Sequence, residues 1–169
     1  TDIHIFTEIW IENIYKKKNF DIKNNDIIID IGANIGLFSL WAYQFCKKGQ
    51  IYCYEPNNDN FIILEKNILE NNLTNISAFK KIVSNTEGIR KLYQTNDFGT
   101  NNIYGSKNDS IDVQSITLEK IFDENKISNC SFLKMDCEGA EYEILLNLPE
   151  SFFTKINKIV ELIKFQVYN

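Results

Sequence analysis

Two short apolar runs near the start of the chain contain or end in an acidic residue, and glycines follow the first run. Asp30 lies in the first run, Ile27–Ile31, and Gly32 and Gly36 come directly after it, while Glu55 ends the second run. Glycines allow a tight turn and a close approach of the backbone to a ligand. A carboxylate at the end of a neighbouring strand can accept hydrogen bonds from both hydroxyls of a ribose. The pattern therefore predicts a site for a cofactor that contains a ribose.

Two cofactor classes fit such a site, dinucleotides and S-adenosylmethionine. The strict G-x-G-x-x-G spacing of dinucleotide sites is missing, because Asn34 stands where a pyrophosphate binder needs a glycine. The Asp30 carboxylate would repel a pyrophosphate, whereas it would attract the cationic sulfonium and ammonium of S-adenosylmethionine, directly or through water. We therefore expect S-adenosylmethionine, and a nicotinamide-dependent reductase is the alternative.

Three further carboxylates cluster after a later apolar run. Asp136 ends the run Cys130–Asp136, and Glu138 and Glu141 follow it. We expect Glu138 in the first turn of a helix, where the helix dipole favours negative charge, and Glu141 on the same helix face three residues later. The cluster thus predicts acidic side chains at the same sheet edge as Asp30.

Two charged neighbours of this cluster receive different interpretations. Lys134 precedes Asp136 by two positions along the predicted strand, so both side chains can face one side of it. An ion pair between them would keep Asp136 ionised. We interpret Glu143, by contrast, as a charge on a solvated helix face.

Strands and helices must alternate to bring these residues together. Extended patterns are predicted over residues 27–31, 50–54, 76–83, 88–94, 115–116, 130–136 and 159–163. Helical patterns are predicted over residues 5–18, 37–46, 57–71 and 138–148, with a short helix capped by Thr117 and a polar loop over residues 95–110. This alternation predicts an α/β fold with a doubly wound, mostly parallel sheet, whose strands end at one common edge.

Three segments of the chain resemble the main motifs of the FkbM-type methyltransferase family in order and spacing. They are Asp30–Gly36, Glu55–Pro56 and Lys134–Glu141, and the resemblance runs from about Phe6 to Glu161. It implies a class I, Rossmann-like enzyme that uses S-adenosyl-L-methionine. Such enzymes mostly methylate hydroxyl oxygens on sugars or natural products, so a small-molecule or glycan acceptor is expected.

The resemblance also implies which residues hold the cofactor. Its methionine and ribose end would lie against Asp30, Gly32, Ala33, Asn34 and Gly36. Glu55 would hold the ribose hydroxyls, with Pro56 and Asn57 beside it, and Ser84 would contact the adenine.

The catalytic candidates are Asp136 and Glu138. Methyl transfer to a hydroxyl needs in-line geometry and often a base that takes the proton. Asp136 would lie beside the methyl group, in contact with the cofactor or the acceptor. Some related O-methyltransferases hold a metal with carboxylates at the ends of the fourth and fifth strands, where Asp136 and Glu161 lie. The Asp-Asn pair typical of those relatives is missing after the fifth strand, so no metal is expected.

Composition restricts the class of protein. The chain has 169 residues, 44% hydrophobic and 24% charged, which fits one globular domain over residues 1–169 with a core at about 26–165. Its net charge of −5 argues against a nucleic-acid partner and hence against RNA methylation. No apolar run is long enough to span a membrane, and no leader peptide is visible. Four cysteines without metal-site spacing fit a reduced, cytoplasmic protein.

The C-terminal part of the pattern is incomplete. A class I methyltransferase sheet usually has a sixth and a seventh strand, whereas only about eight residues follow Glu161. These strands are therefore expected to be short or missing, and an open sheet edge would favour a homodimer. The alternative function is a catalytically incomplete domain that binds the cofactor or acts as a scaffold. The acceptor would be selected by the loop over 95–110 and by the N-terminal helix.

Overall fold

The computed structural model describes residues 3, 6–12, 14, 21–93, 110–137 and 139–161. The predicted loop over 95–110 lies almost wholly outside these residues, as does Glu138. Most of the predicted N-terminal helix over 5–18 is also outside them, and the described part contains a short helical segment, Thr7–Ile11.

Within the described residues, five parallel strands form the central sheet, in the order β3-β2-β1-β7-β8. Their bounds are β1 Ile27–Ile31, β2 Gln50–Tyr54, β3 Ile76–Phe79, β7 Phe132–Met135 and β8 Ile159–Glu161. Four of the five residues of β1 are buried, as expected for a strand covered on both faces. The sheet confirms the predicted α/β class with parallel strands.

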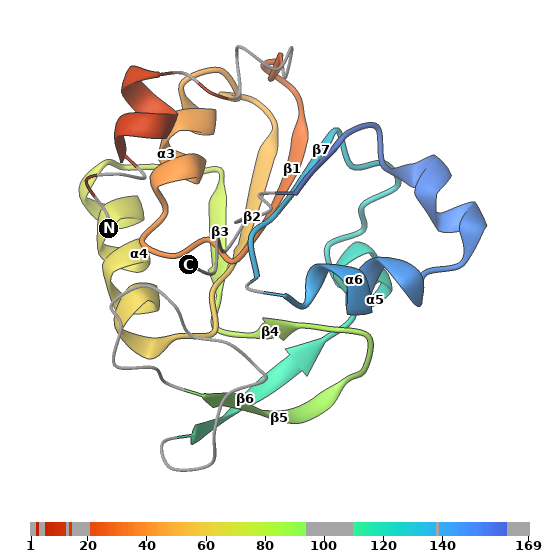
Figure 1. Cartoon of the computed structure of the whole chain (residues 1–169). Helices are drawn as coiled ribbons and strands as arrows, with labels where there is room; N and C mark the ends of the chain where they lie inside the picture. The colour runs from red at the N-terminus through yellow and green to blue at the C-terminus, as the bar shows by residue number, and fades with distance from the viewer. Residues whose placement is uncertain are drawn as a thin grey trace, which may run out of the picture.

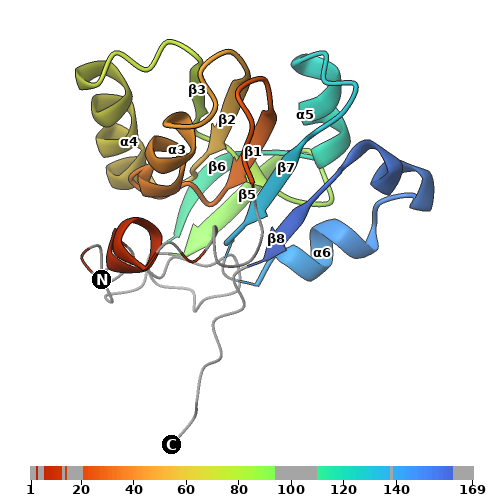
Figure 2. The same ribbon diagram turned by 90° about the horizontal axis from the view of Figure 1, so that it is seen from above.

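Helices cover both faces of this sheet (Figures 1 and 2). On one face lie α3 Leu37–Tyr43 and α4 Asn58–Glu70, and on the other lie α5 Leu118–Glu124 and α6 Glu141–Leu146. A 3₁₀ helix, Glu150–Lys155, leads from α6 towards β8. The apolar side chains of the two helix layers form two cores, separated by the sheet. Thr117 caps α5 as predicted, by accepting from the backbone N–H of Lys120.

A second, three-stranded sheet lies below the central sheet in the view of Figure 1. It consists of β4 Ile82–Val83, β5 Gly88–Tyr93 and β6 Ser110–Ile116, in the order β4-β6-β5. The prediction of one strand over 76–83 is wrong, because β3 pairs with β2 whereas β4 pairs with β6. The chain therefore passes from one sheet to the other at Lys80 and Lys81.

None of the helices within the described residues is long and apolar enough to cross a membrane.

Candidate functional site

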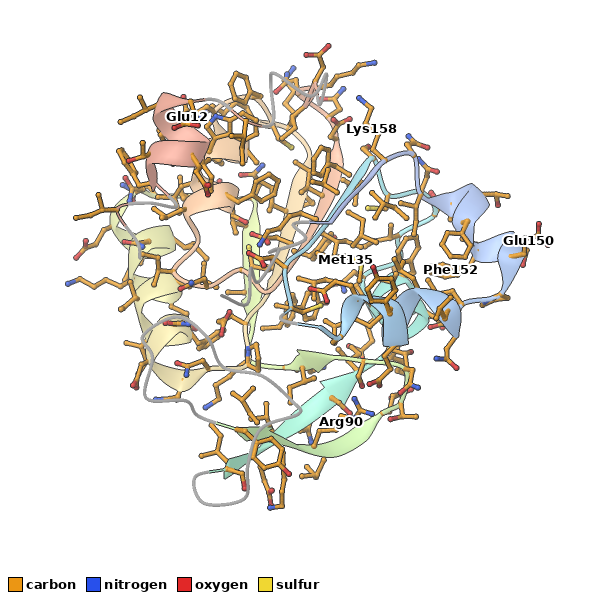
Figure 3. The ribbon with its side chains drawn as sticks, viewed as in Figure 1. Glu12, Arg90, Met135, Glu150, Phe152 and Lys158 are labelled. Atoms are coloured by element: carbon orange, nitrogen blue, oxygen red, sulfur yellow. The ribbon has the colours of Figure 1, made fainter. Side chains whose placement is uncertain are left out.

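Three of the predicted site residues, Gly32, Glu55 and Asp136, lie at the carboxyl edge of the central sheet. The last paired row of β2, β1 and β7 consists of Tyr54, Ile31 and Met135. Figure 3 labels Met135 near the centre of the molecule, where β7 ends. The residues that come directly after this row are Glu55, Gly32 and Asp136.

The loop after β1 has a shape that requires glycine. Gly32, Asn34 and Gly36 all have positive φ angles, of 71°, 53° and 90°. A Cβ atom on Gly32 would overlap the carbonyl oxygen of Asp136, and one on Gly36 would lie 2.6 Å from a methyl group of Leu64. The two glycines thus allow this loop to pack against the exit of β7 and against α4.

The Glu55 carboxylate is fixed by this loop and by the start of α4. It is 5% exposed. Its Oε2 accepts from the backbone N–H of Asn34 at 2.8 Å, and its Oε1 accepts from that of Asn57 at 2.9 Å. Burial raises the pKa of Glu55, while the two amides and the nearby Lys134 ammonium act in the opposite direction. A carboxylate has about four acceptor positions, and those that the two backbone amides and the Asn60 side chain leave open can accept from ribose hydroxyls, so the residues fit the predicted cofactor.

The neighbours of Glu55 serve partly in the fold. The Asn57 side chain caps α4, because its Oδ1 accepts from the backbone N–H groups of Asp59 and Asn60. Pro56 lines a pocket of about 450 Å³ between β3 and β6, together with Phe79, Lys80 and Val113 among others. That volume is typical of a small-molecule site.

Asp30 lies inside the molecule, below the glycine loop. Its side chain is 0% exposed, and its Oδ1 lies 2.9 Å from the Lys134 ammonium. Its Oδ2 accepts from the Ser39 hydroxyl at 2.7 Å. The structure therefore places Lys134 against Asp30, a contact that the sequence analysis did not predict, and the suggested pair of Lys134 with Asp136 stays a prediction. The predicted contact of Asp30 with the cofactor stays a prediction, and a direct contact would require the carboxylate to leave this interior position.

The loop after β7 is held by Glu141, which the sequence analysis places in the acidic cluster but gives no catalytic or cofactor-binding role. Asp136 is half-buried, and its backbone N–H donates to Ile31. Glu141 is 6% exposed and accepts from the backbone N–H groups of Cys137 and Gly139 at 2.6 and 2.8 Å. Helix α6 begins at Glu141 and not at Glu138, because Gly139 has a φ of 103° that no right-handed helix accommodates. The available signal was the glycine two residues before Glu141.

Ser84 follows β4 of the second sheet, and Glu143 on α6 contacts this sheet. Ser84 is 1% exposed, and its hydroxyl donates to the carbonyl of Thr86, so its predicted contact with adenine stays a prediction. The interpretation of Glu143 as a solvated charge is wrong. Its Oε1 lies 2.7 Å from Arg90, and the side chain is 17% exposed. Figure 3 labels Arg90 on the second sheet, below α6.

The two carboxylates considered as metal ligands, Asp136 and Glu161, follow or end the neighbouring strands β7 and β8. Glu161 ends β8 beside Met135, but its side chain is not among the described ones. Within the described residues, no group of three or more histidine, cysteine or acidic side chains is placed to hold a metal ion.

Several known proteins that are similar to this chain are named methyltransferases. The model of the methyltransferase FkbM domain family matches residues 30–169. Methyltransferase sdnD of Sordaria araneosa is 25% identical over 92% of this chain and 72% of its own length. The 31-O-demethyl-FK506 methyltransferase FkbM of Streptomyces tacrolimicus is 20% identical, with the same two coverages.

Two solved methyltransferase structures share the fold of this chain. A methyltransferase FkbM from Methylobacillus flagellatus KT has a TM-score of 0.53 at 17% identity, over 75% of this chain and 30% of that one. A precorrin-6y C5,15-methyltransferase from Geobacter metallireducens GS-15 has a TM-score of 0.52 at 12% identity, over 85% of this chain and 57% of that one. This chain thus spans about a third of the first of those proteins and a little more than half of the second. It belongs to the methyltransferase FkbM domain family.

Proposed function

We propose that this chain transfers the methyl group of S-adenosylmethionine to a hydroxyl oxygen of a sugar or another small hydroxylated metabolite. The observation that carries the proposal is the placement of Glu55 and Asp136 on either side of Gly32, one residue beyond the last row of the sheet. One relative is named for a 31-O-demethyl substrate, which supports oxygen as the accepting atom. Family membership favours this enzyme over a scaffold domain.

The cofactor would be held mainly by Glu55 and by the glycine loop. The bound cofactor supplies an electrophilic methyl group on a sulfonium. Glu55 is already oriented by the Asn34 and Asn57 amides, so it loses little side-chain freedom when it accepts the ribose hydroxyls. The positive φ angles of Gly32 and Gly36 let the loop backbone lie close to the ligand.

Asp136 would act on the acceptor. It follows the buried strand β7 directly, and its backbone is fixed to β1 by the hydrogen bond to Ile31. A half-buried carboxylate at this edge can orient an acceptor hydroxyl and take its proton as the oxygen attacks. Glu138, outside the described residues, is the second candidate for this role. The pocket beside Pro56 offers room for a nucleoside or a sugar ring.

The test is transfer of a labelled methyl group to a panel of sugars and small alcohols, with amines as competitors. Asp136→Asn should lower kcat by roughly 100-fold to 10,000-fold, the usual contribution of a general base. It should change the affinity for S-adenosylhomocysteine far less. Asp123→Asn, in an exposed position on α5, is the matched control and should keep full activity.

Two results would contradict the proposal. One is label found only on nitrogen or carbon atoms of the acceptors. The other is an unchanged kcat in Asp136→Asn, which would contradict the role of Asp136 as the base and leave Glu138 or the solvent for that role.

A further inference from the structure

A buried ion pair lies directly below the cofactor loop. Asp30 and Lys134 are paired residues of the neighbouring strands β1 and β7. Their side chains are 0% and 5% exposed, with 2.9 Å between Oδ1 and Nζ. Charged side chains are seldom this buried unless they are paired, because removal from water is costly.

The Lys134 ammonium reaches beyond Asp30. Its Nζ also donates to the carbonyl oxygen of Gly32 at 2.8 Å. Gly32 is the first residue of the cofactor loop. One ammonium on β7 therefore fixes both the end of β1 and the backbone with which this loop begins.

A third element joins the same network. The Ser39 hydroxyl, in α3, donates to the second oxygen of Asp30 at 2.7 Å. Because α3 begins where the cofactor loop ends, the pair of Asp30 and Lys134 is connected to both ends of that loop. The carboxylate already faces one cation and one hydroxyl inside the core, so a sulfonium outside it would gain little from its charge.

We infer that Lys134 is a positioning residue for the cofactor loop, and that Asp30 acts on the cofactor through Lys134 and Gly32 rather than as a counter-ion of the sulfonium. The inference rests on the cofactor site described above and not on the identity of the acceptor.

The first experiment compares two ligands that differ in charge. S-adenosylmethionine carries the sulfonium cation and S-adenosylhomocysteine does not. Asp30→Asn keeps the shape of the side chain, and we expect it to weaken both ligands by the same factor, so that the ratio of their Kd values stays within about twofold. A counter-ion would instead make S-adenosylmethionine lose at least about tenfold more affinity than S-adenosylhomocysteine.

The outcomes of this titration separate the two claims. If Asp30→Asn loses much more affinity for S-adenosylmethionine than for S-adenosylhomocysteine, the inference is overturned, but the assignment of the cofactor site stands. Failure of the wild-type chain to bind either ligand overturns the cofactor site itself. Glu70→Gln, in an exposed ion pair on α4, is the matched control and should leave both Kd values unchanged.

The second experiment separates positioning from stability. Lys134→Met and Asp30→Asn each leave one buried charge without its partner, so each should lower Tm by roughly 10 °C. The double variant removes both charges of this pair, and its Tm should recover above that of either single variant. Its affinity for S-adenosylhomocysteine should nevertheless stay at least about fivefold below the wild type, because Gly32 has lost its anchor.

Recovered stability without recovered affinity is the signature of a positioning role. If a single variant fails to fold, the double variant alone supplies this comparison with the wild type. A double variant that binds like the wild type, or whose Tm loss equals the sum of the two single losses, overturns the inference. Lys66→Met in the exposed pair with Glu70 is the control and should change neither Tm nor affinity.

Discussion

Glu55 combines two requirements that oppose each other. It must be ionised to accept from the ribose hydroxyls, yet it is 5% exposed, and burial disfavours its charge. The amides of Asn34 and Asn57 reduce this conflict, because each donates to one carboxylate oxygen. The sequence predicts the acid at this strand end, but it does not show that the predicted ligand loop itself supplies one of the donors that orient it.

The affinity for S-adenosylhomocysteine should therefore depend on pH through Glu55. Burial raises the pKa of Glu55 above 4.5, so the carboxyl takes up a proton at a higher pH than an exposed glutamate does. Protonation removes an acceptor, and calorimetric titration should show Kd rising as pH falls through this raised pKa. Glu55→Gln should bind roughly 10-fold to 100-fold more weakly, with little pH dependence.

The contribution of Glu55 to folding should have the opposite sign. A raised pKa in the folded state means that this contribution is fully present below pH 4.5 and is lost as pH rises through the raised pKa. Unfolding of the unliganded wild type and of Glu55→Gln, followed over the same pH range, measures this difference. Glu65→Gln, exposed on α4, should match the wild type in both measurements. An affinity that is constant down to pH 4.5 would contradict a raised pKa.

Glu141 should control the loop that presents Asp136. Its carboxylate accepts from the backbone N–H groups of Cys137 and Gly139, and a glutamine can accept with only one of its two terminal atoms. Glu141→Gln should therefore speed hydrogen exchange at one or both of these amides by about tenfold or more, since a hydrogen bond to a charged group contributes about 1.5–3 kcal/mol. Exchange followed by NMR measures this, and Glu150→Gln in the exposed start of the 3₁₀ helix is the control. Unchanged protection at both amides would exclude this role of Glu141.

Among the helices and strands, the sequence pattern predicts those whose bounds depend only on neighbouring residues. The run Ile27–Ile31 is predicted with its observed bounds, because consecutive β-branched residues need burial on both faces. The break between β3 and β4 could not be predicted, since it depends on pairing with β6, which comes much later in the chain. The pairing of Lys134 with Asp30 was likewise hidden, because it requires β7 to lie beside β1.

An ion pair of the chain's only arginine, Arg90, connects the second sheet to α6. Arg90 on β5 lies 2.7 Å from Glu143 on α6, with the two side chains 27% and 17% exposed. Because the pair is largely shielded, Arg90→Ala should lower the free energy of unfolding by about 1–2 kcal/mol. Lys91→Ala is the control, since its pair with Asp112 on the same sheet is exposed, and its effect should be too small to measure. If denaturant unfolding gives equal losses of unfolding free energy for the two variants, the Arg90 pair does not stabilise the contact between the second sheet and α6.

The whole molecule unites residues that lie far apart in the sequence. Gly32, Glu55 and Asp136 meet only because β1 lies between β2 and β7, so that their exits share one edge. In a parallel sheet the carboxyl ends of neighbouring strands always lie at one edge. The sequence motifs were therefore sufficient to predict that these three residues share that edge. The motifs could not predict which side chains would be buried beneath the edge, because burial depends on the packing of both helix layers.

Binding at this edge should stabilise the molecule as a unit. A ligand that binds only the folded state, at 100 times its Kd, adds about 2.7 kcal/mol to the free energy of unfolding. For a domain of this size, that corresponds to a rise in Tm of roughly 5–10 °C. S-adenosylhomocysteine should produce this rise in a thermal scan, whereas NADH at the same concentration should not, because Asn34 replaces the glycine that a pyrophosphate needs. The Glu55→Gln variant should lose most of the rise at the same ligand concentration. A larger shift with NADH than with S-adenosylhomocysteine would contradict the assignment of the cofactor.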